Sequence, residues 1–299
     1  MKPTNPFHSA NKDFWEAESE NWSRATDRRG TWRRCPTEPE LVLSDMELHY
    51  LAGIAGKRVC VLGSGDNQVV FALAGLGAFV TSVDISQNQL QVAQQHSREL
   101  GLSIEFVQAD VTDLSALTSG SFDVVYTGGH VALWVADLLK YYAESARILA
   151  PEGLLVISEY HPFRRIWKES KTTLSVKSRY LDRGPFEYEY TGNILSRKSG
   201  SLKSYEYHWT IADYVNSVIS SGCRILFVDE FGEDVGSWEG APLAGLPEFL
   251  LIVARKMSNK SLGRSADSLF LNWFGAAEVE CNRRARSTQT FDASRFPHK

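Results

Sequence analysis

The chain has 299 residues, of which 43% are hydrophobic and 23% charged, with a formal net charge of −4. Its length suits a large globular core, while the acidic balance disfavours a nucleic-acid partner and no apolar stretch is long enough to span a membrane. The four cysteines form no C-x-x-C pair and the first residues contain no apolar leader, so we expect a cytoplasmic enzyme with a small-molecule partner, without metal or membrane contact.

The first part of the chain, residues 1–57, is predicted to be a helical cap. It contains the aromatic-rich helical segment FWEAESENWSRA and a second helical stretch at 38–53. Trp15, Trp22 and Trp32 in this region either close over a bound ligand or form the apolar face of a docked helix.

From Arg58 to about Tyr160, short β-branched runs alternate with longer helical patterns. We predict strands at 58–62, 79–83, 104–108, 122–127 and 153–159, and helices at about 67–75, 87–100 and 133–149. Such alternation is typical of an α/β fold in which helices cover both faces of a parallel sheet.

The composition changes after Tyr160. Residues 161–207 are predicted to form a lid-like insertion, with FEYEY at 186–190 and YEYHW at 205–209 as an antiparallel ribbon around Gly192-Asn193. A helix at about 210–221, a strand at 224–230, a loop at 232–247 and an apolar strand at 249–254 follow. The last two strands have no helix between them, so we expect an antiparallel pair. The polar tail, 257–299, is expected to lie outside the core fold.

The stretch VLGSGDN at 61–67 is predicted to bind a nucleotide cofactor. Gly63 and Gly65 allow a tight turn after the first strand, but Gln68 stands where a dinucleotide fingerprint has its third glycine. Asp84 ends the second strand, where a carboxylate can hold ribose hydroxyls. Asp110 follows the third strand and can accept a hydrogen bond from an adenine amino group.

These motifs resemble those of the class I S-adenosylmethionine-dependent methyltransferases. The resemblance runs from about Gly56 to Lys256 and includes VLGSGDN, VTSVDIS, FVQADVTDL, SFDVVYTGG, ILAPEGLLVISE and LPEFLLIVARK. It implies a Rossmann-like, doubly wound sheet of seven strands with an antiparallel final pair, the domain spanning 58–256, and S-adenosylmethionine as cofactor. The residues that it implies for cofactor binding are Gly63, Gly65, Asp84, Ile85, Asp110, Val111, Thr127 and Gly128.

Two positions depart from the pattern of this family. Val61 replaces an acid that commonly organises the methionine amine, and Asn67 replaces a third glycine. An NAD-dependent oxidoreductase, which Asp84 would also suit, and a non-catalytic scaffold with the same fold therefore remain as alternatives.

Three residues are candidates for a general base that would act on a small-molecule acceptor. His130 follows the fourth strand, and Glu159 and His161 lie at the end of the fifth. His130 can instead point to solvent at the start of a helix, and His161 can be structural because it precedes Pro162. Their spacing does not suggest a metal site.

Overall fold

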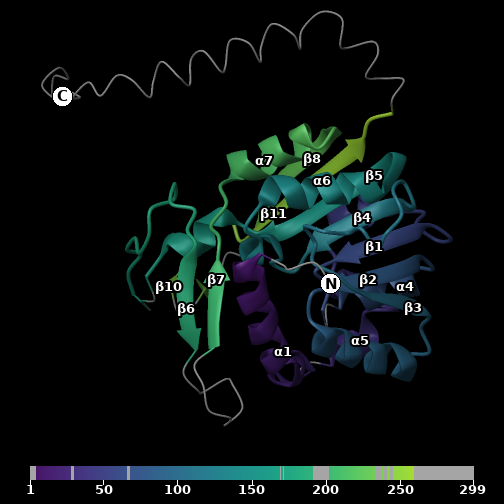
Figure 1. Ribbon diagram of the computed structural model, residues 1–299, viewed down its shortest axis with the longest axis horizontal. Helices are drawn as coiled ribbons and strands as arrows, with labels where there is room; N and C mark the ends of the chain where they lie inside the picture. Colours follow the sequence, from purple (N-terminus) through teal and green to yellow (C-terminus); the bar gives the residue numbers. More distant parts are fainter. Residues whose placement is uncertain are drawn as a thin grey trace, which may run out of the picture. The chain divides into compact units, whose positions relative to one another are not determined.

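A mixed sheet of seven strands forms the centre of the fold in the computed structural model (Figure 1). The strand order is β3-β2-β1-β4-β5-β11-β8. The first five strands along this order are parallel, and β11 is antiparallel to both β5 and β8. Their bounds are Arg58–Leu62 (β1), Phe79–Asp84 (β2), Ile104–Gln108 (β3), Phe122–Gly128 (β4), Leu149–Tyr160 (β5), Cys223–Phe231 (β8) and Phe249–Lys256 (β11). The predicted architecture is confirmed, including the reversed final pair.

The structure describes residues 5–27, 30–65, 68–168, 170, 172–190, 202–232, 237–238, 241–242 and 245–258. The tail from 259 and the predicted Gly192-Asn193 turn lie outside these residues. Within the described residues, no helix has both the length and the hydropathy needed to cross a membrane.

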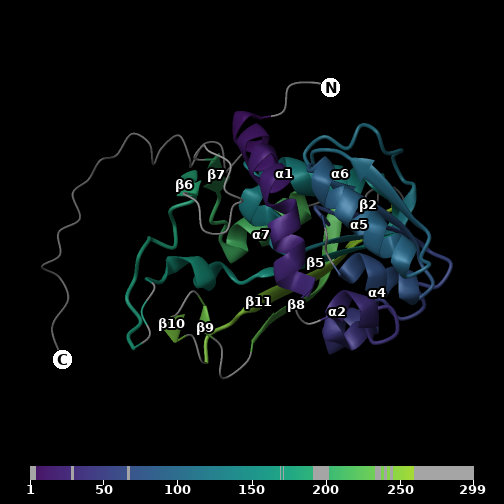
Figure 2. The ribbon, with the colours of Figure 1, turned by 90° about the horizontal axis from the view of Figure 1, so that it is seen from below.

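Alternate side chains of β1 belong to two hydrophobic cores, one on each face of the sheet. Cys60 and Leu62 face the core that includes helices α6 (Leu138–Ile148) and α7 (Ile211–Ser220). Val59 and Val61 face the core that includes α4 (Val69–Gly75), to which α5 (Gln87–Glu99) contributes Ala93. All four β1 side chains are fully buried, as expected when successive strand residues point to opposite covered faces. Figure 2 shows α6 and α4 on opposite sides of the sheet.

Two predicted helices have different bounds in the structure. The predicted helix 38–53 is a 3-10 turn, η1 (Pro39–Leu41), and a separate helix, α3 (Asp45–Tyr50), which Ser44 starts with a capping box. The predicted helix 133–149 begins only at Leu138, because Asp137 caps it by accepting a hydrogen bond from the Lys140 N–H. Its first predicted residues form instead the 3-10 turn η2 (Ala132–Trp134).

The amino-terminal helix α1 (Pro6–Asp27) lies between α5 and a ribbon made of β6 (Phe186–Tyr190) and β7 (Leu202–Glu206) (Figure 1). The ribbon is antiparallel, as predicted, but its second strand begins three residues earlier than expected. Asn11 joins α1 to the ribbon, because its side-chain oxygen accepts from the Tyr205 N–H at 2.7 Å and its amide donates to the Tyr205 carbonyl at 2.9 Å.

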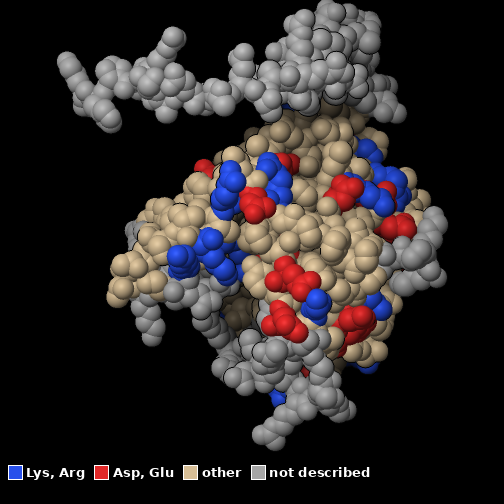
Figure 3. Space-filling model, turned by 60° about the vertical axis from the view of Figure 1, so that its left-hand side comes forward, with Lys and Arg blue, Asp and Glu red and all other residues tan. Residues whose placement is uncertain are grey.

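The smaller elements are α2 (Thr31–Arg34), η3 (Pro162–Ile166), β9 (Ser237–Trp238) and β10 (Ala241–Pro242). On the face drawn in Figure 3, basic and acidic side chains form small separate groups among uncharged residues. No field of one sign covers that face, which agrees with the modest net charge of −4.

Candidate active site

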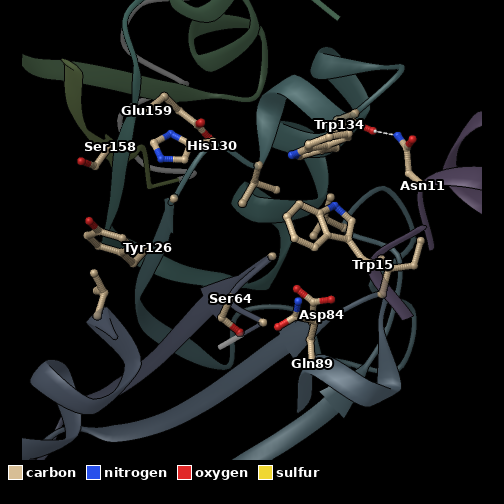
Figure 4. A pocket seen from close by; sticks show the side chains of 18 of the residues that line it. Asn11, Trp15, Ser64, Asp84, Gln89, Tyr126, His130, Trp134, Ser158 and Glu159 are labelled. Carbon is tan, nitrogen blue, oxygen red and sulfur yellow. Dashed lines mark hydrogen bonds between the residues drawn. The ribbon is translucent and has the colours of Figure 1, made fainter. Parts of the chain in front are cut away.

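A cavity of about 390 Å³ lies where the parallel strands end (Figure 4). Eight of the eleven residues predicted for cofactor binding or catalysis line it: Gly63, Gly65, Asp84, Ile85, Asp110, Val111, His130 and Glu159. Thr127, Gly128 and His161 are not among its lining residues. Thr127 is fully buried on β4, and Gly128 ends that strand beside Ser158.

The turn after β1 requires its two glycines. Gly63 and Gly65 have φ angles of 63° and 42°, in the left-handed region that other residues avoid. A Cβ atom on Gly63 would also overlap the side chain of Val131. Ser64, between the glycines, donates its N–H to the Val83 carbonyl at 3.0 Å, which ties the turn to the end of β2.

Asp84 lies at the end of β2, with its carboxylate close to the glycine turn. It is 9% exposed, and one of its oxygens accepts from the Ser86 N–H at 2.8 Å. Burial raises the pKa of Asp84 to about 6, although backbone hydrogen bonds from Ser86 and Gly65 oppose the rise. The carboxylate is therefore mostly ionised at neutral pH and able to accept from a ribose hydroxyl.

Asp110 is held by a residue from α1 that the sequence analysis did not identify. Its Oδ2 atom is 2.7 Å from Nδ1 of His8, and its Oδ1 atom accepts from the backbone and side chain of Thr112. Nε2 of His8 accepts from the Ala136 N–H at 2.8 Å, so Nδ1 carries the proton and donates it to Asp110. Burial favours a higher pKa for Asp110, but the bonds from His8 and Thr112 outweigh it and lower the pKa.

A second contact from α1 lies beside Asp84. The Glu16 carboxylate accepts from the Gln87 and Asn88 N–H groups at 2.9 and 2.8 Å, at the start of α5. A carboxylate is favoured at this position because the N–H groups in the first turn of a helix have no partners within the helix. Helix α1 is thus fixed near both acids that the sequence predicts for the adenosine moiety.

The three tryptophans of the amino-terminal segment have different environments. Trp15 and Trp22 line the cavity, and the rings of Trp15 and Trp134 pack edge to face with their centroids 5.4 Å apart. Trp32 is buried in the core and stacks on His96. The first two therefore fit a ligand cover, and the third fits the packing alternative.

His130 occupies a turn after β4 with an unusual backbone conformation. Gly129 and His130 have φ angles of 71° and 73°, and the imidazole stacks on the Tyr160 ring. The Nδ1 atom is buried without a hydrogen-bond partner. Burial, followed by the charges of Arg165 and Arg164, holds the pKa of His130 well below its usual value, so the ring is neutral at pH 7.

The side chains of Glu159 and His161 accept hydrogen bonds from neighbouring backbone groups, unlike the Nδ1 atom of His130. Glu159 is 2% exposed and accepts from the backbone N–H groups of Val131 and Ala132, and burial raises its pKa to about 8. His161 is fully buried, with Nε2 2.6 Å from Glu230 and Nδ1 accepting from the Phe163 N–H. Both side chains therefore stabilise the loops around the cavity.

A second cavity of about 30 Å³ lies behind His130 and Glu159, which line both spaces. It is bounded on its other side by His161 and His208. Nowhere among the described residues do three or more His, Cys, Asp or Glu side chains gather as a metal site would require.

The chain is similar to several known proteins. The family described as "Methyltransferase domain" matches residues 61–157. A ubiquinone biosynthesis O-methyltransferase from Xanthomonas oryzae pv. oryzae is 28% identical over 186 residues, which make up 61% of this chain and 74% of that relative.

Solved structures show the same similarity. An S-adenosylmethionine-dependent methyltransferase from Mesorhizobium loti has a TM-score of 0.53 and 26% identity, covering 70% of this chain and 94% of its own. The magnesium protoporphyrin IX methyltransferase of Synechocystis PCC 6803, solved with bound S-adenosylmethionine, shares the fold with a TM-score of 0.53 and 15% identity. The match covers 86% of this chain and 100% of that chain.

Proposed function

We propose that this chain, which is a class I S-adenosylmethionine-dependent methyltransferase, methylates a hydroxyl group of a small acceptor and uses His130 as the general base. The family match and the fold do not favour the two alternatives, an NAD-dependent oxidoreductase and a non-catalytic scaffold. When bound, S-adenosylmethionine supplies a methyl group that its sulfonium already activates. The protein must then hold donor and acceptor in line and exclude water.

The cofactor would occupy the part of the cavity around the glycine turn. Asp84 would accept from the ribose hydroxyls. Asp110 retains a free lone pair on Oδ2 beside the one that His8 uses, and it would accept from the adenine amino group. Ile85 and Val111 line the same part of the cavity and would pack against the adenine ring.

The observation that carries the proposal is the state of His130. Its ring lines the cavity, is neutral at pH 7, and has one buried nitrogen with no partner. A neutral imidazole can take a proton from a hydroxyl group as the methyl group is transferred. Glu159 is less suited to this role, because a carboxyl with a pKa of about 8 is mostly protonated at pH 7. His161 is engaged by Glu230 and Phe163.

The lining of the cavity supports a small acceptor without a net negative charge. Trp15, Trp134 and Phe249 contribute aromatic surface. The two arginines whose charges act on His130, Arg165 and Arg164, are paired with Glu206 at 3.7 Å and with Glu248 at 2.7 Å. The similarity to an O-methyltransferase supports oxygen as the methylated atom.

The test is a screen of hydroxylated aromatic acceptors that follows formation of S-adenosylhomocysteine. His130→Asn is the informative variant, because asparagine tolerates a left-handed φ better than most residues. We expect the variant to lose roughly 10²- to 10⁴-fold in kcat, the usual contribution of a general base, while S-adenosylhomocysteine binds with unchanged affinity. His49→Asn, on the exposed face of α3, is the matched control.

Two outcomes contradict the proposal. An unchanged kcat and pH profile in His130→Asn would exclude the base. Turnover of amines, thiols or carbon acceptors, but of no hydroxylated compound, would exclude oxygen as the acceptor atom.

A further inference from the structure

We infer that the end of the cavity opposite Asp84 is an ammonium subsite, formed by the hydroxyl groups of Tyr126 and Ser158 with the carboxylate of Glu47 behind them (Figure 4). Its occupant is the α-ammonium group of the cofactor. The inference rests on the proposed function and assigns a role to residues that the sequence did not single out.

Glu47 is a buried carboxylate with two separate tasks. It is 3% exposed and belongs to the capping box of α3, in which one oxygen accepts from the Ser44 N–H at 2.8 Å. Its other oxygen accepts from the Tyr126 hydroxyl at 2.5 Å. A capping box needs only the first of these contacts. The second brings a negative charge to the back of the cavity wall.

Tyr126 connects this carboxylate to the cavity through a hydrogen bond. Its ring lines the cavity from β4, between the fully buried Val61 of β1 and Val156 of β5. Burial, and then Glu47, raise the pKa of Tyr126 well above its usual value, so the phenol keeps its proton and donates it to Glu47. The phenolic oxygen can then only accept further hydrogen bonds.

Ser158 completes the subsite from β5. Its side chain lines the cavity, and in Figure 4 its hydroxyl points to the same side as that of Tyr126. Its proximity to the phenol opposes part of the rise in the pKa of Tyr126. Two oxygens backed by a carboxylate form a site that favours a cationic donor of several hydrogen bonds, such as an ammonium group.

The position of the subsite in the sheet selects the occupant. Asp84 ends β2, and Tyr126 lies on β4, two places further along the strand order and level with Ser82. The backbones of Asp84 and Tyr126 are therefore about 12 Å apart at the usual strand spacing and rise. The glycine turn of β1 lies between them. With its ribose on Asp84, the cofactor would have its amino acid within reach of Tyr126 across this turn.

Val61 strengthens this assignment. It is the register partner of Tyr126 and faces the same side of the sheet, and it stands where the resemblance leads us to expect an acid. Glu47 supplies a carboxylate to that side from a different part of the chain.

The test compares two ligands by calorimetry with the full chain. S-adenosylhomocysteine carries the amino acid, and methylthioadenosine has the same adenosine and a thioether but no amino acid. Tyr126→Phe and Glu47→Gln should each lower the affinity for S-adenosylhomocysteine about 10- to 100-fold, the usual effect of losing a hydrogen bond to a charged group. The affinity for methylthioadenosine should stay unchanged.

Ser44→Ala is the matched control, because it disturbs the same capping box without removing the charge or the phenol. It should lower the thermal midpoint and keep the ratio of the two affinities. An equal loss for both ligands in Tyr126→Phe, or no loss for S-adenosylhomocysteine, overturns the inference. Failure of the unaltered chain to bind either ligand would instead refute the cofactor assignment itself.

Discussion

Replacing Glu159 with glutamine should remove a loss of stability that the native chain undergoes between pH 7 and pH 8. The native carboxyl has a pKa of about 8, compared with 4.5 for the unburied group, because burial disfavours its charged form. A carboxyl group whose pKa is higher in the folded than in the unfolded chain stabilises the fold fully at pH values below its unfolded-state pKa. This contribution is lost as the pH rises through its folded-state pKa. The free energy of unfolding should therefore fall as the solution becomes more alkaline.

The magnitude follows from the two pKa values. For one group with these constants, the free energy of unfolding falls by about 1 kcal/mol between pH 7 and pH 8. In a chain of this size the thermal midpoint should fall by roughly 2 to 4 °C. Burial lowers the pKa values of His130 and His161, so loss of the remaining proton from the unfolded chain raises the free energy of unfolding by at most about 0.2 kcal/mol for each between pH 7 and pH 8. This gain is smaller than the loss at Glu159 and leaves the direction unchanged.

The measurement is thermal or urea unfolding at pH 7 and pH 8. A glutamine oxygen can still accept from the Val131 and Ala132 N–H groups, so Glu159→Gln should fold and show a flat response in this interval. The control is Glu144→Gln, which removes a partly exposed carboxyl whose pKa is lowered by Arg147 and should retain the native slope. A native chain with equal stability at both pH values, or a Glu159→Gln variant with the native slope, would refute the reasoning.

Three further results are expected. Gly63→Ala should lower both the thermal midpoint and the affinity for S-adenosylhomocysteine, since its Cβ would overlap Val131 at a φ of 63°; unchanged values in both assays would contradict the turn geometry. Asp84 has a pKa of about 6, and ribose hydroxyls favour its charged form, so calorimetry should show affinity rising from pH 5 to pH 7 with proton release, and Asp84→Asn should abolish this dependence. His8→Ala removes a donor to Asp110 and should weaken S-adenosylhomocysteine several-fold in the same titration, whereas equal binding would show that His8 has no part in the site.

Much of the fold could be predicted because its signals are local. The run at 58–62 is apolar and β-branched, and the observed strand has the same bounds. The two missed helix boundaries also had local signals: Ser44 and Glu47 have the spacing of a capping box, and Asp137 is a favoured cap. These signals were present in the sequence, but the longer hydrophobic pattern concealed them.

The side chains that complete the site could not be predicted in the same way. His8 and Asp110 are 102 residues apart, and Glu47 and Tyr126 are 79 apart. Each contact depends on where an amino-terminal helix packs against the sheet, and no spacing in the sequence encodes that position. Sequence patterns therefore indicated the acids that we propose for the cofactor site, but not the distant residues that contact Asp110 and Tyr126.

The contacts of α1 make the amino-terminal segment a part of the proposed cofactor site. Asp110 is the proposed acceptor for adenine and also the residue to which His8 anchors this helix, at 2.7 Å. Glu16 anchors the same helix at the start of α5, which begins three residues after Asp84. Two binding events that share a residue are coupled, and the coupling is reciprocal. His8 on the docked α1 orients the Asp110 carboxylate, so any gain in adenine affinity that the docked helix provides is matched by an equal gain in helix docking when adenine binds.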